Sequence, residues 1–380
     1  MRFHRYHFIS VCFSILFYLI TSYVNSMGSK LGLAYSQIGM INFFGALSYV
    51  ITSISIGHLG DKFGYKKILI VEFLLYFFFL VVSLNLSGVF SLVVIAVISN
   101  LFFGSFYPQI EGLISKSESL ANFPHSKTVM RFNLSWSFGN IIGMALGPFM
   151  TVKYPQIIFG YGLFLSAAMS IFVWYDYKSF GNYIKLLGCD FKMEKIVKNI
   201  KRYRLVYRST LFFSGLLYTS VLALFPKLIS SYGTALSLTG FLIAFANLSV
   251  FLTFLFMGKF NFWVGKPKIS FYFLLVLPVT SLLMFFKPSP MLFLVISFLS
   301  GMCYAIPYTF AIYYGLHSEE DDQGKQGGFH EAVIGLLFGF GPLIGGTFLD
   351  YFSGIKGLGI FGLLLTIIVF FIQIRFLIKK

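Results

Sequence analysis

Long apolar runs, separated by short polar breaks, follow one another along the whole chain. Most of them exceed the roughly 18–20 residues that a helix needs to cross the hydrocarbon core of a bilayer. Because lipid offers no partners for unpaired backbone groups, we expect each run to form a helix. The twelve runs fall at 7–25, 36–57, 67–85, 89–110, 129–150, 155–175, 209–230, 236–258, 268–286, 290–316, 329–350 and 355–377.

The composition also indicates a chain that is solvated by lipid. Hydrophobic residues make up 57% of the 380 positions and charged residues only 11%, whereas a soluble domain carries about 25% charged residues. Cys12, Cys189 and Cys303 are scattered and show no metal-binding or redox spacing. We therefore expect an all-α membrane protein that holds no metal and no other cofactor.

An intramembrane enzyme, such as a lipid or prenyl transferase, is a rival interpretation. It would need acids or histidines clustered on facing helices, but the acidic run 319–322 lies in a predicted loop and no HExxH pattern occurs. The GxxxxGK[ST] phosphate loop of ATP-driven proteins does not occur either. We therefore expect no catalytic residues.

The basic residues predict how the chain is oriented in the membrane. The net charge is +16, and if the N-terminus is cytoplasmic, all but five of the 29 lysines and arginines fall in segments that face the cytoplasm. Positive charge favours the cytoplasmic side, so we expect an even number of spans with both termini inside. The charge thus reports topology and indicates no nucleic-acid partner. We expect a monomer in the plasma membrane.

A basic polar stretch at 176–208 divides the chain. We expect six-helix bundles at 1–175 and at 209–380 on its two sides. Within 193–203, apolar residues recur at helical spacing while basic residues occupy the other faces. This pattern suits an interfacial helix that lies against anionic lipid head groups. A basic linker without a specific partner is the alternative.

The two parts of the chain echo each other weakly. Residues 57–67 read GHLGDKFGYKK and residues 258–268 read GKFNFWVGKPK, with two glycines seven apart and a lysine three after the second. Gly-Tyr-Pro groups at 104–108 and 301–307 follow, and then Gly-Pro groups at 139–148 and 335–342. Pseudo-symmetric halves are typical of transporters, which bind substrate between their repeats.

Segment 57–69 resembles the loop 2–3 signature of the major facilitator superfamily. The residues that carry the resemblance are Gly57, Asp61, Lys62, Gly64, Lys66 and Lys67. The resemblance implies twelve transmembrane helices in two pseudo-symmetric bundles, which rock about a central cavity lined mainly by the first, fourth, seventh and tenth helices. It also implies a cytoplasmic gate in which Asp61 holds the halves together. A solvated turn is the alternative interpretation of this segment.

Small residues predict a seam between helices in the runs 129–150 and 329–350. Glycines four residues apart let helix backbones approach closely, and a Gly-Pro step favours a kink because proline removes a backbone hydrogen bond. Ordinary packing and a bending seam both remain open. The seam candidates are Gly143, Gly147, Pro148, Gly341 and Pro342.

Polar side chains inside the runs predict a solute pathway. Buried amides and phenols are costly in lipid, so they should face protein or a cavity. Packing or interhelical hydrogen bonding is the alternative for each residue taken alone. The pathway candidates are Tyr18, Thr21, Asn25, Asn100, Tyr107, Asn140, Tyr218, Tyr304 and Tyr308.

No lysine or arginine lies deep in a predicted span, so a fixed cationic site for a phosphate or a carboxylate is missing. The family's proton-antiporter motif would place an arginine four residues before Gly104, where this chain has Asn100. We therefore expect a secondary transporter that moves a small neutral or amphipathic organic solute by alternating access. A multidrug/proton efflux antiporter and a membrane sensor without transport are the alternatives.

Acids near or inside the membrane are candidates for proton coupling. Glu72 lies about two turns into the run 67–85, Glu111 closes the run 89–110, and Glu331 opens the run 329–350. We select Glu331 and Glu72 as coupling candidates. For Glu331, helix capping or an ion pair with Arg131 or Lys127 at the cytoplasmic rim remains the alternative.

Overall fold

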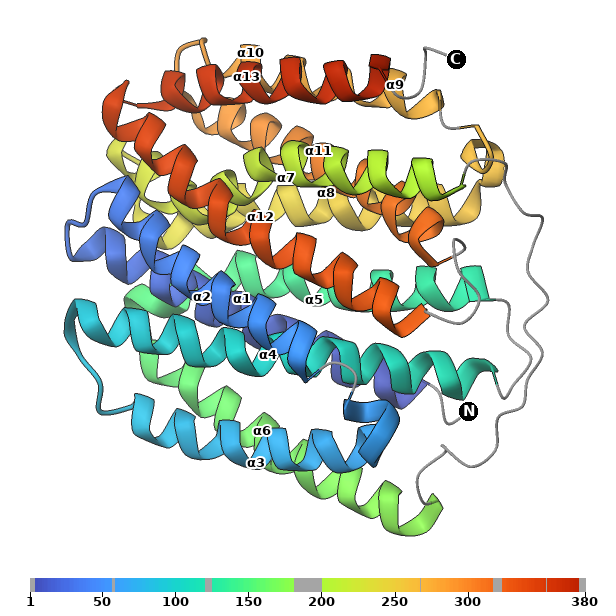
Figure 1. Cartoon of the computed structure of the whole chain (residues 1–380). Helices are drawn as coiled ribbons and strands as arrows, with labels where there is room; N and C mark the ends of the chain where they lie inside the picture. The colour runs from blue at the N-terminus through green and yellow to red at the C-terminus, as the bar shows by residue number, and fades with distance from the viewer. Residues whose placement is uncertain are drawn as a thin grey trace.

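The computed structural model describes residues 4–56, 59–119, 125–180, 200–266, 268–316, 323–352 and 354–375. Over these ranges the chain consists of long α-helices, short helical turns and connecting loops, and it contains no strand. The axes of the long helices run roughly from left to right in Figure 1, and the helices pack side by side into one bundle. The predicted all-α class is confirmed.

The N-terminal half comprises six long helices and one π-helical turn. They are α1 (His4–Lys30), α2 (Tyr35–Ser55), η1 (Gly60–Gly64), α3 (Tyr65–Ser83), α4 (Gly88–Ser119), α5 (His125–Lys153) and α6 (Pro155–Phe180). The C-terminal half also has six long helical segments if the two short helices α9 and α10 are counted as one. They are α7 (Ile200–Ser231), η3 (Leu236–Leu238), α8 (Thr239–Lys259), η4 (Asn261–Trp263), α9 (Ile269–Phe273), α10 (Val276–Leu283), α11 (Pro290–Leu316), α12 (Gln323–Tyr351) and α13 (Ile355–Gln373).

Each apolar run corresponds to a helical segment, but several helices extend beyond their runs. The helix α4 continues to Ser119 and α12 begins at Gln323, so Glu111 and Glu331 each lie about two turns inside a helix. The reason is that hydropathy reports the length embedded in lipid, whereas a helix continues as long as its backbone bonds do. The expectation that these acids lie at helix ends is therefore wrong.

The run 268–286 forms two helices, α9 and α10, instead of one. Pro278 has no N–H to bond to the carbonyl of Leu274, and its ring crowds that carbonyl. The Leu277 N–H turns to the Leu274 oxygen instead, at 3.0 Å. The helix is thus interrupted one turn before the proline.

Each half has its own apolar core. One cluster of buried side chains comes from α1 to α6, between Tyr6 and Val173. The other extends from Val206 to Val369 and includes only Tyr18, Ile38 and Met144 from the first half. In Figure 1, α3 and α6 lie at the lower edge of the bundle and α10 and α13 at the upper edge. The remaining helices meet in the middle.

The two halves touch through close helix pairs. At Gly39 of α2, an added Cβ atom would meet the Pro342 backbone of α12 at less than contact distance. At Gly240 of α8, it would meet the backbones of Met144 and Ala145 on α5. Small residues thus let backbones of opposite halves touch, as is common between helices in membranes.

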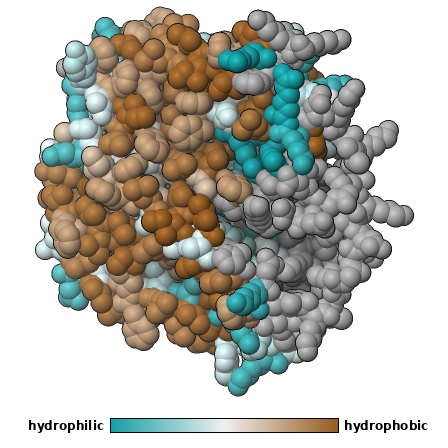
Figure 2. Space-filling model, in the orientation of Figure 1, coloured by the Kyte–Doolittle hydropathy of each residue, from teal (hydrophilic) through white to brown (hydrophobic). Residues whose placement is uncertain are grey.

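The outer surface of the bundle is apolar. Nine helices of the described chain are long and apolar enough to cross a membrane, namely α1, α2, α4, α6, α7, α8, α11, α12 and α13. Large side chains such as Phe90, Phe164 and Ile367 are exposed, and Figure 2 shows apolar residues over much of the visible face. An apolar surface of this extent suits contact with lipid and not with water.

The helices cross the bundle alternately in each direction, so α1 begins and α13 ends at the same end, on the right of Figure 1. We call this the terminal end and the other the opposite end. The predicted linker 176–208 includes the last residues of α6 and the first turns of α7. Its middle, 181–199, with most of the predicted interfacial helix, lies outside the described residues.

Candidate functional site

A cavity lies between the two halves, in the middle of the bundle. The space there that no protein atom fills measures about 630 Å³, including the part that is open to the outside of the protein. Helices of both halves contribute to its wall, and most of the contributing side chains are aromatic. The lining residues are Phe17, Tyr18, Ala46, Tyr49, Asn100, Tyr107, Phe132, Trp136, Asn140, Tyr218, Tyr304, Tyr308, Glu331, Ile334, Gly335 and Phe338.

The cavity is offset toward the terminal end. Tyr49 lies in the last third of α2, and Phe132 and Glu331 lie in the first third of α5 and of α12. These three positions are all in the half of the helix that is nearer to the terminal end. The halves touch toward the opposite end, where Gly240 meets Ala145 and Gly39 meets Pro342, and they also touch near the terminal end, where Gly258 of α8 meets Met130 of α5.

Tyrosines of the two halves meet across the cavity. The hydroxyls of Tyr18 and Tyr218 lie 3.5 Å apart, and the Tyr218 hydroxyl donates to Asn247 Oδ1 at 2.8 Å. The rings of Tyr218 and Tyr304 stack with centroids 4.6 Å apart. This contact links α1, α7, α8 and α11 at one point.

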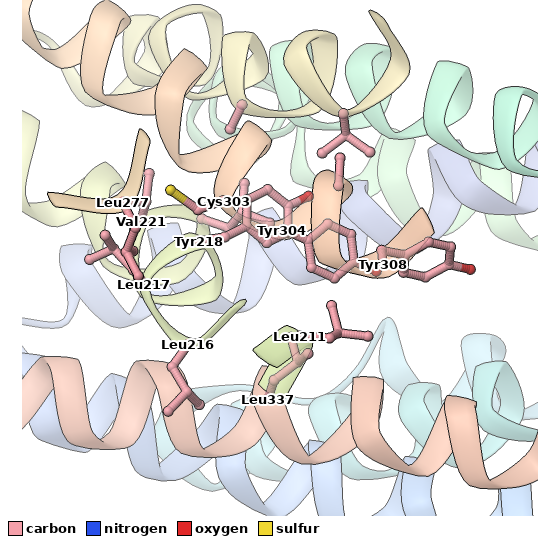
Figure 3. Close-up of a cluster of buried hydrophobic side chains, with 14 of the residues drawn as sticks. Leu211, Leu216, Leu217, Tyr218, Val221, Leu277, Cys303, Tyr304, Tyr308 and Leu337 are labelled. Atoms are coloured by element: carbon pink, nitrogen blue, oxygen red, sulfur yellow. The ribbon is translucent and has the colours of Figure 1, made fainter. Parts of the chain in front are cut away.

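A continuous aromatic wall runs along α11 from this point. Figure 3 shows Tyr218, Tyr304 and Tyr308 one after another. The Tyr304 and Tyr308 centroids are 5.4 Å apart, and the Tyr308 ring meets Trp136 of α5 edge-on at 5.8 Å. All four rings belong to the cavity lining.

The other wall comes from α1 and α4. The Tyr107 and Ser14 hydroxyls are 2.9 Å apart, which holds the Tyr107 ring against α1. Phe17 packs edge-on against Tyr18 and Tyr107, at 5.4 and 6.3 Å. Aromatic residues thus line the cavity from both halves.

Glu331 is the one charged residue among the described residues of the lining. Its side chain is buried, and its Oε2 accepts a hydrogen bond from the Tyr49 hydroxyl at 2.6 Å. The bond connects α12 to α2, across the two halves. Among the described contacts the partner of Glu331 is a phenol, and Glu331 lies inside α12 and not at its start. The side chain of Lys127, one of the two predicted ion-pair partners, lies outside the described residues.

Seven of the nine predicted pathway residues line the cavity, whereas Thr21 and Asn25 do not. Asn25 instead accepts a hydrogen bond from Asn42 Nδ2 at 2.8 Å, between α1 and α2. The run of polar residues on α1 therefore extends past the cavity toward the opposite end. Asn140 is 3% exposed and belongs to the lining, and its buried Oδ1 has no hydrogen-bond partner among the described residues.

The second coupling candidate lies elsewhere. Glu72 of α3 accepts a hydrogen bond from the Ser105 hydroxyl of α4, inside the N-terminal half. It is absent from the described lining of the cavity. Glu331 and Glu72 are therefore not brought together.

The predicted gating segment is only partly described. Gly57 and the Asp61 side chain lie outside the described residues. Gly64 has a φ of 98° at the start of α3, a backbone conformation that glycine adopts without strain. Lys62 is exposed beside the ring of Phe63, and Lys67 lies 5.7 Å from the centroid of Tyr177.

Lys66 points into the N-terminal half. Its side chain is 1% exposed, and its Nζ lies 2.6 Å from Asp176 Oδ2 on α6. The Tyr6 hydroxyl of α1 donates to the same carboxylate. The sequence predicts that Lys66 belongs to a gating segment that holds the two halves together. Its described partner, Asp176, belongs to the N-terminal half, as Lys66 itself does.

The seam candidates divide between two interfaces. On α5, Gly143 and Gly147 pack against Tyr18 and Ser22 of α1, within one half. Pro148 lies against Gly240 of α8, across the halves. On α12, Gly341 packs against Thr219 of α7, while Pro342 meets Gly39 of α2.

Tyr49 and Trp136 line the cavity although the sequence did not single them out. For Trp136 a signal was available, because Asn133, Trp136 and Asn140 share one helical face. For Tyr49 the signal was weaker, since its run carries several small polar residues. Among the described residues, no group of three His, Cys, Asp or Glu side chains is placed to hold a metal.

Solved structures of transporters have the same fold as this chain. The nucleoside transporter NupG shares the fold at a TM-score of 0.67 and 14% identity, over 100% of this chain and 99% of that one. A bacterial homologue of the human lysosomal transporter Spinster, in an inward-facing and unoccupied conformation, matches at 0.69 and 12% identity, over 99% and 98%.

The sequence comparisons give one decisive result. A search of curated protein sequences finds no match. The family profile described as Major Facilitator Superfamily matches residues 6–318, which is most of the chain. The fold, the central cavity and this match agree, and the chain belongs to the major facilitator superfamily.

Proposed function

We propose that the protein is a secondary transporter that moves a small neutral or amphipathic organic solute across the membrane by alternating access. The observation that supports this proposal is the cavity between the halves, with Tyr18, Tyr218 and Tyr304 meeting across it. A site shared by two bundles can face one side or the other as the bundles rock. Membership of the superfamily agrees with this function.

The lining supports the proposed solute class. Aromatic rings provide apolar faces, while the amides of Asn100 and Asn140 provide polar atoms. Ligand sites commonly combine an apolar wall with a few orienting polar groups. The described lining holds no lysine or arginine, which disfavours a phosphate or a carboxylate as the bound group.

The structural neighbours suggest which solutes to test first. NupG is a nucleoside transporter, and a nucleoside is an uncharged solute with a planar base. Such a base can stack on the rings of Tyr304 and Tyr308, which lie in the cavity. Nucleosides therefore belong in the first panel, together with sugars, amino acids and amphipathic drugs.

A multidrug/proton efflux antiporter is the second candidate. Glu331 favours it, because a carboxyl group in a solute cavity can exchange a proton for a solute. Its surroundings contain the hydroxyls of Tyr49, Tyr107, Tyr304 and Tyr308, and the acid Glu111 of α4. His330 precedes it on α12, and Arg208 of α7 acts electrostatically on that histidine.

The proposed placement in the membrane follows the distribution of charge. The terminal end faces the cytoplasm, because the segments at this end contain most of the lysines and arginines. Anionic lipid head groups are the expected partners of this basic face. We place the transporter in the plasma membrane as a monomer.

Reconstitution into liposomes tests the proposal. Uptake of each radiolabelled solute of the panel is compared between protein-containing and empty liposomes. Tyr304→Ala should reduce uptake of the active solute at least about fivefold, which corresponds to roughly 1 kcal/mol of binding free energy. The control Tyr272→Ala removes an exposed tyrosine of α9 and should leave uptake unchanged. Binding without transport of any solute would instead favour the sensor.

A further inference from the structure

We infer that the cavity selects an aromatic amine in its protonated form, with Glu331 as the residue that recognises the positive charge. This inference rests on the proposed transport function and names the solute class for the same cavity. It specifies the amphipathic solute as a planar ring joined to an ammonium group with at least one N–H.

The first support is the charge of the lining. Glu331 is buried, and the Tyr49 hydroxyl, which bonds to Oε2, is its one hydrogen-bond donor among the described residues. An ionised carboxylate in a low-dielectric site needs more compensation than one neutral donor gives. A cationic ligand supplies the missing charge, whereas a neutral ligand does not.

The second support is the arrangement of aromatic faces. Tyr218, Tyr304, Tyr308 and Trp136 form the continuous wall described above, with neighbouring centroids 4.6 to 5.8 Å apart. The electron-rich face of an aromatic ring attracts ammonium groups, and offset stacking accommodates a planar ligand ring. One wall thus serves both parts of the proposed ligand.

The third support is an acceptor without a donor. Asn140 belongs to the cavity lining, and its buried Oδ1 has no hydrogen-bond partner among the described residues. A buried unpaired acceptor costs free energy unless a ligand or a water donates to it. Asn140 and Glu331 both offer oxygen acceptors, so a ligand that donates N–H bonds fits the cavity better than one that only accepts.

The charged neighbours do not reverse this preference. Glu111 of α4 interacts electrostatically with Glu331, so the described acids reinforce each other. His330 is buried on α12 against the Tyr308 ring, with centroids 4.7 Å apart, and is not part of the lining. Arg208 acts on His330 from α7. Among the described residues, Tyr107, Tyr304 and Tyr308 also interact electrostatically with Glu331.

A pair of matched ligands tests the inference. N-Methylphenethylamine is protonated at neutral pH, and N-methyl-2-phenylacetamide has the same ring, a similar length and one N–H but no charge. Binding of each to the purified full-length protein in detergent is measured by isothermal titration at pH 7.5. We expect the amine to bind at least about tenfold more tightly than the amide, the difference that a compensated buried charge makes.

Two variants locate the origin of this preference. Glu331→Gln should bring the affinities of amine and amide to within about twofold of each other, while amide binding is retained and shows that the cavity is folded. The control Glu72→Gln changes a partly buried acid outside the cavity lining and should keep the preference for the amine. If the Glu331→Gln variant does not fold, Tyr308→Leu should weaken amine binding several-fold while Tyr308→Phe should not, because the phenylalanine keeps the aromatic face.

Contrary results are equally informative. Equal binding of amine and amide to the unmodified protein would overturn the role of the charge. A preference that survives Glu331→Gln would overturn the assignment to Glu331. If neither ligand binds, the solute class is wrong, and the liposome assay with the solute panel decides separately whether the protein is a transporter.

Discussion

At the scale of single residues, the ion pair between Lys66 and Asp176 stands out. Both side chains are buried, and the Tyr6 hydroxyl adds a third contact at Asp176. A buried ion pair contributes little compared with an apolar pair of the same volume, but the loss of one partner leaves an uncompensated charge. Replacement of either residue alone should therefore destabilise the fold. The pair joins α3 to α6.

Asp176→Asn should lower the free energy of unfolding by about 3–5 kcal/mol, because it removes the carboxylate that faces the buried Lys66 ammonium. Thermal unfolding in detergent measures the effect. The double variant Lys66→Met/Asp176→Leu should recover most of the loss, and Lys62→Ala, at an exposed lysine, should change little. A single variant as stable as the parent would show that this pair does not matter for the fold.

Glu331 gives a prediction for pH. A proton and a cationic ligand compete for the same carboxylate, so binding of N-methylphenethylamine should weaken as the pH falls and strengthen as it rises. Between pH 5 and 8 the amine itself remains protonated, so the change reports on the protein. Glu331→Gln should flatten this profile, as measured by titration at several pH values. If the variant binds the amine with the same pH profile as the parent, Glu331 is not the group at which proton and amine compete.

The sequence predicted much of the site at this scale. Tyr18, Tyr107, Tyr218, Tyr304 and Tyr308 were found because polar groups within apolar runs need protein or a cavity to face. The hydrogen bond from Tyr49 to Glu331 was not predictable, since 282 positions separate the partners. Periodicity identifies the face of one helix but does not show which helix lies opposite.

At the scale of helices, the contact between α2 and α12 joins the halves along much of their length. Near the opposite end, Asp350 of α12 accepts backbone N–H bonds from Tyr35 and Ser36 at 3.1 and 2.8 Å. These groups begin α2, where a negative charge also interacts favourably with the helix dipole. Lys227 of α7 adds a hydrogen bond to the Leu33 carbonyl and lies 4.5 Å from the Tyr35 ring.

Asp350→Asn should weaken this closure by roughly 1 kcal/mol, because the neutral amide loses most of the interaction with the helix terminus. Spin labels at Leu31→Cys and Tyr351→Cys, both exposed positions, report the separation of the halves by pulsed dipolar spectroscopy in a cysteine-free background. The distance distribution should shift toward larger values. Thr347→Ala, at an exposed position of the same helix, is the matched control, and equal shifts in both variants would contradict the proposal.

The fold was more predictable than the ends of its elements. All twelve apolar runs became helical segments, because lipid leaves the backbone no other choice. The break between α9 and α10 follows from Pro278, but other helices continue through prolines at 108, 148, 307 and 342. Neighbouring helices can satisfy the carbonyl that a proline leaves free, and this depends on contacts that a local sequence pattern does not report.

At the scale of the whole molecule, the halves touch toward the opposite end, and the cavity is offset toward the terminal end. In the orientation that we propose, with the terminal end in the cytoplasm, the contacts at the opposite end lie between the cavity and the outer side of the membrane. Transport requires the reverse arrangement as well, with contacts that close the terminal end. The predicted gate at Asp61 belongs to that end, since η1 connects α2 and α3 there.

Asp61→Asn should therefore reduce transport at least about tenfold, within the range by which coupled states usually differ, while membrane insertion remains normal. Uptake into liposomes measures transport, and the elution volume in detergent monitors folding. Lys259→Gln, at an exposed lysine of α8 outside the predicted gating segment, is the control for a general effect of charge. Unchanged uptake in the Asp61→Asn variant would remove Asp61 from the gate.

The pair between Lys66 and Asp176 also has a consequence for biosynthesis. Its members and Tyr6 all belong to the first 176 residues, so the emerging chain can neutralise this buried charge before α7 is translated. Domains generally fold as units in the order of synthesis. Glu331, by contrast, finds Tyr49 only after nearly nine-tenths of the chain has left the ribosome. The N-terminal half can thus form this ion pair before the C-terminal half has been synthesised.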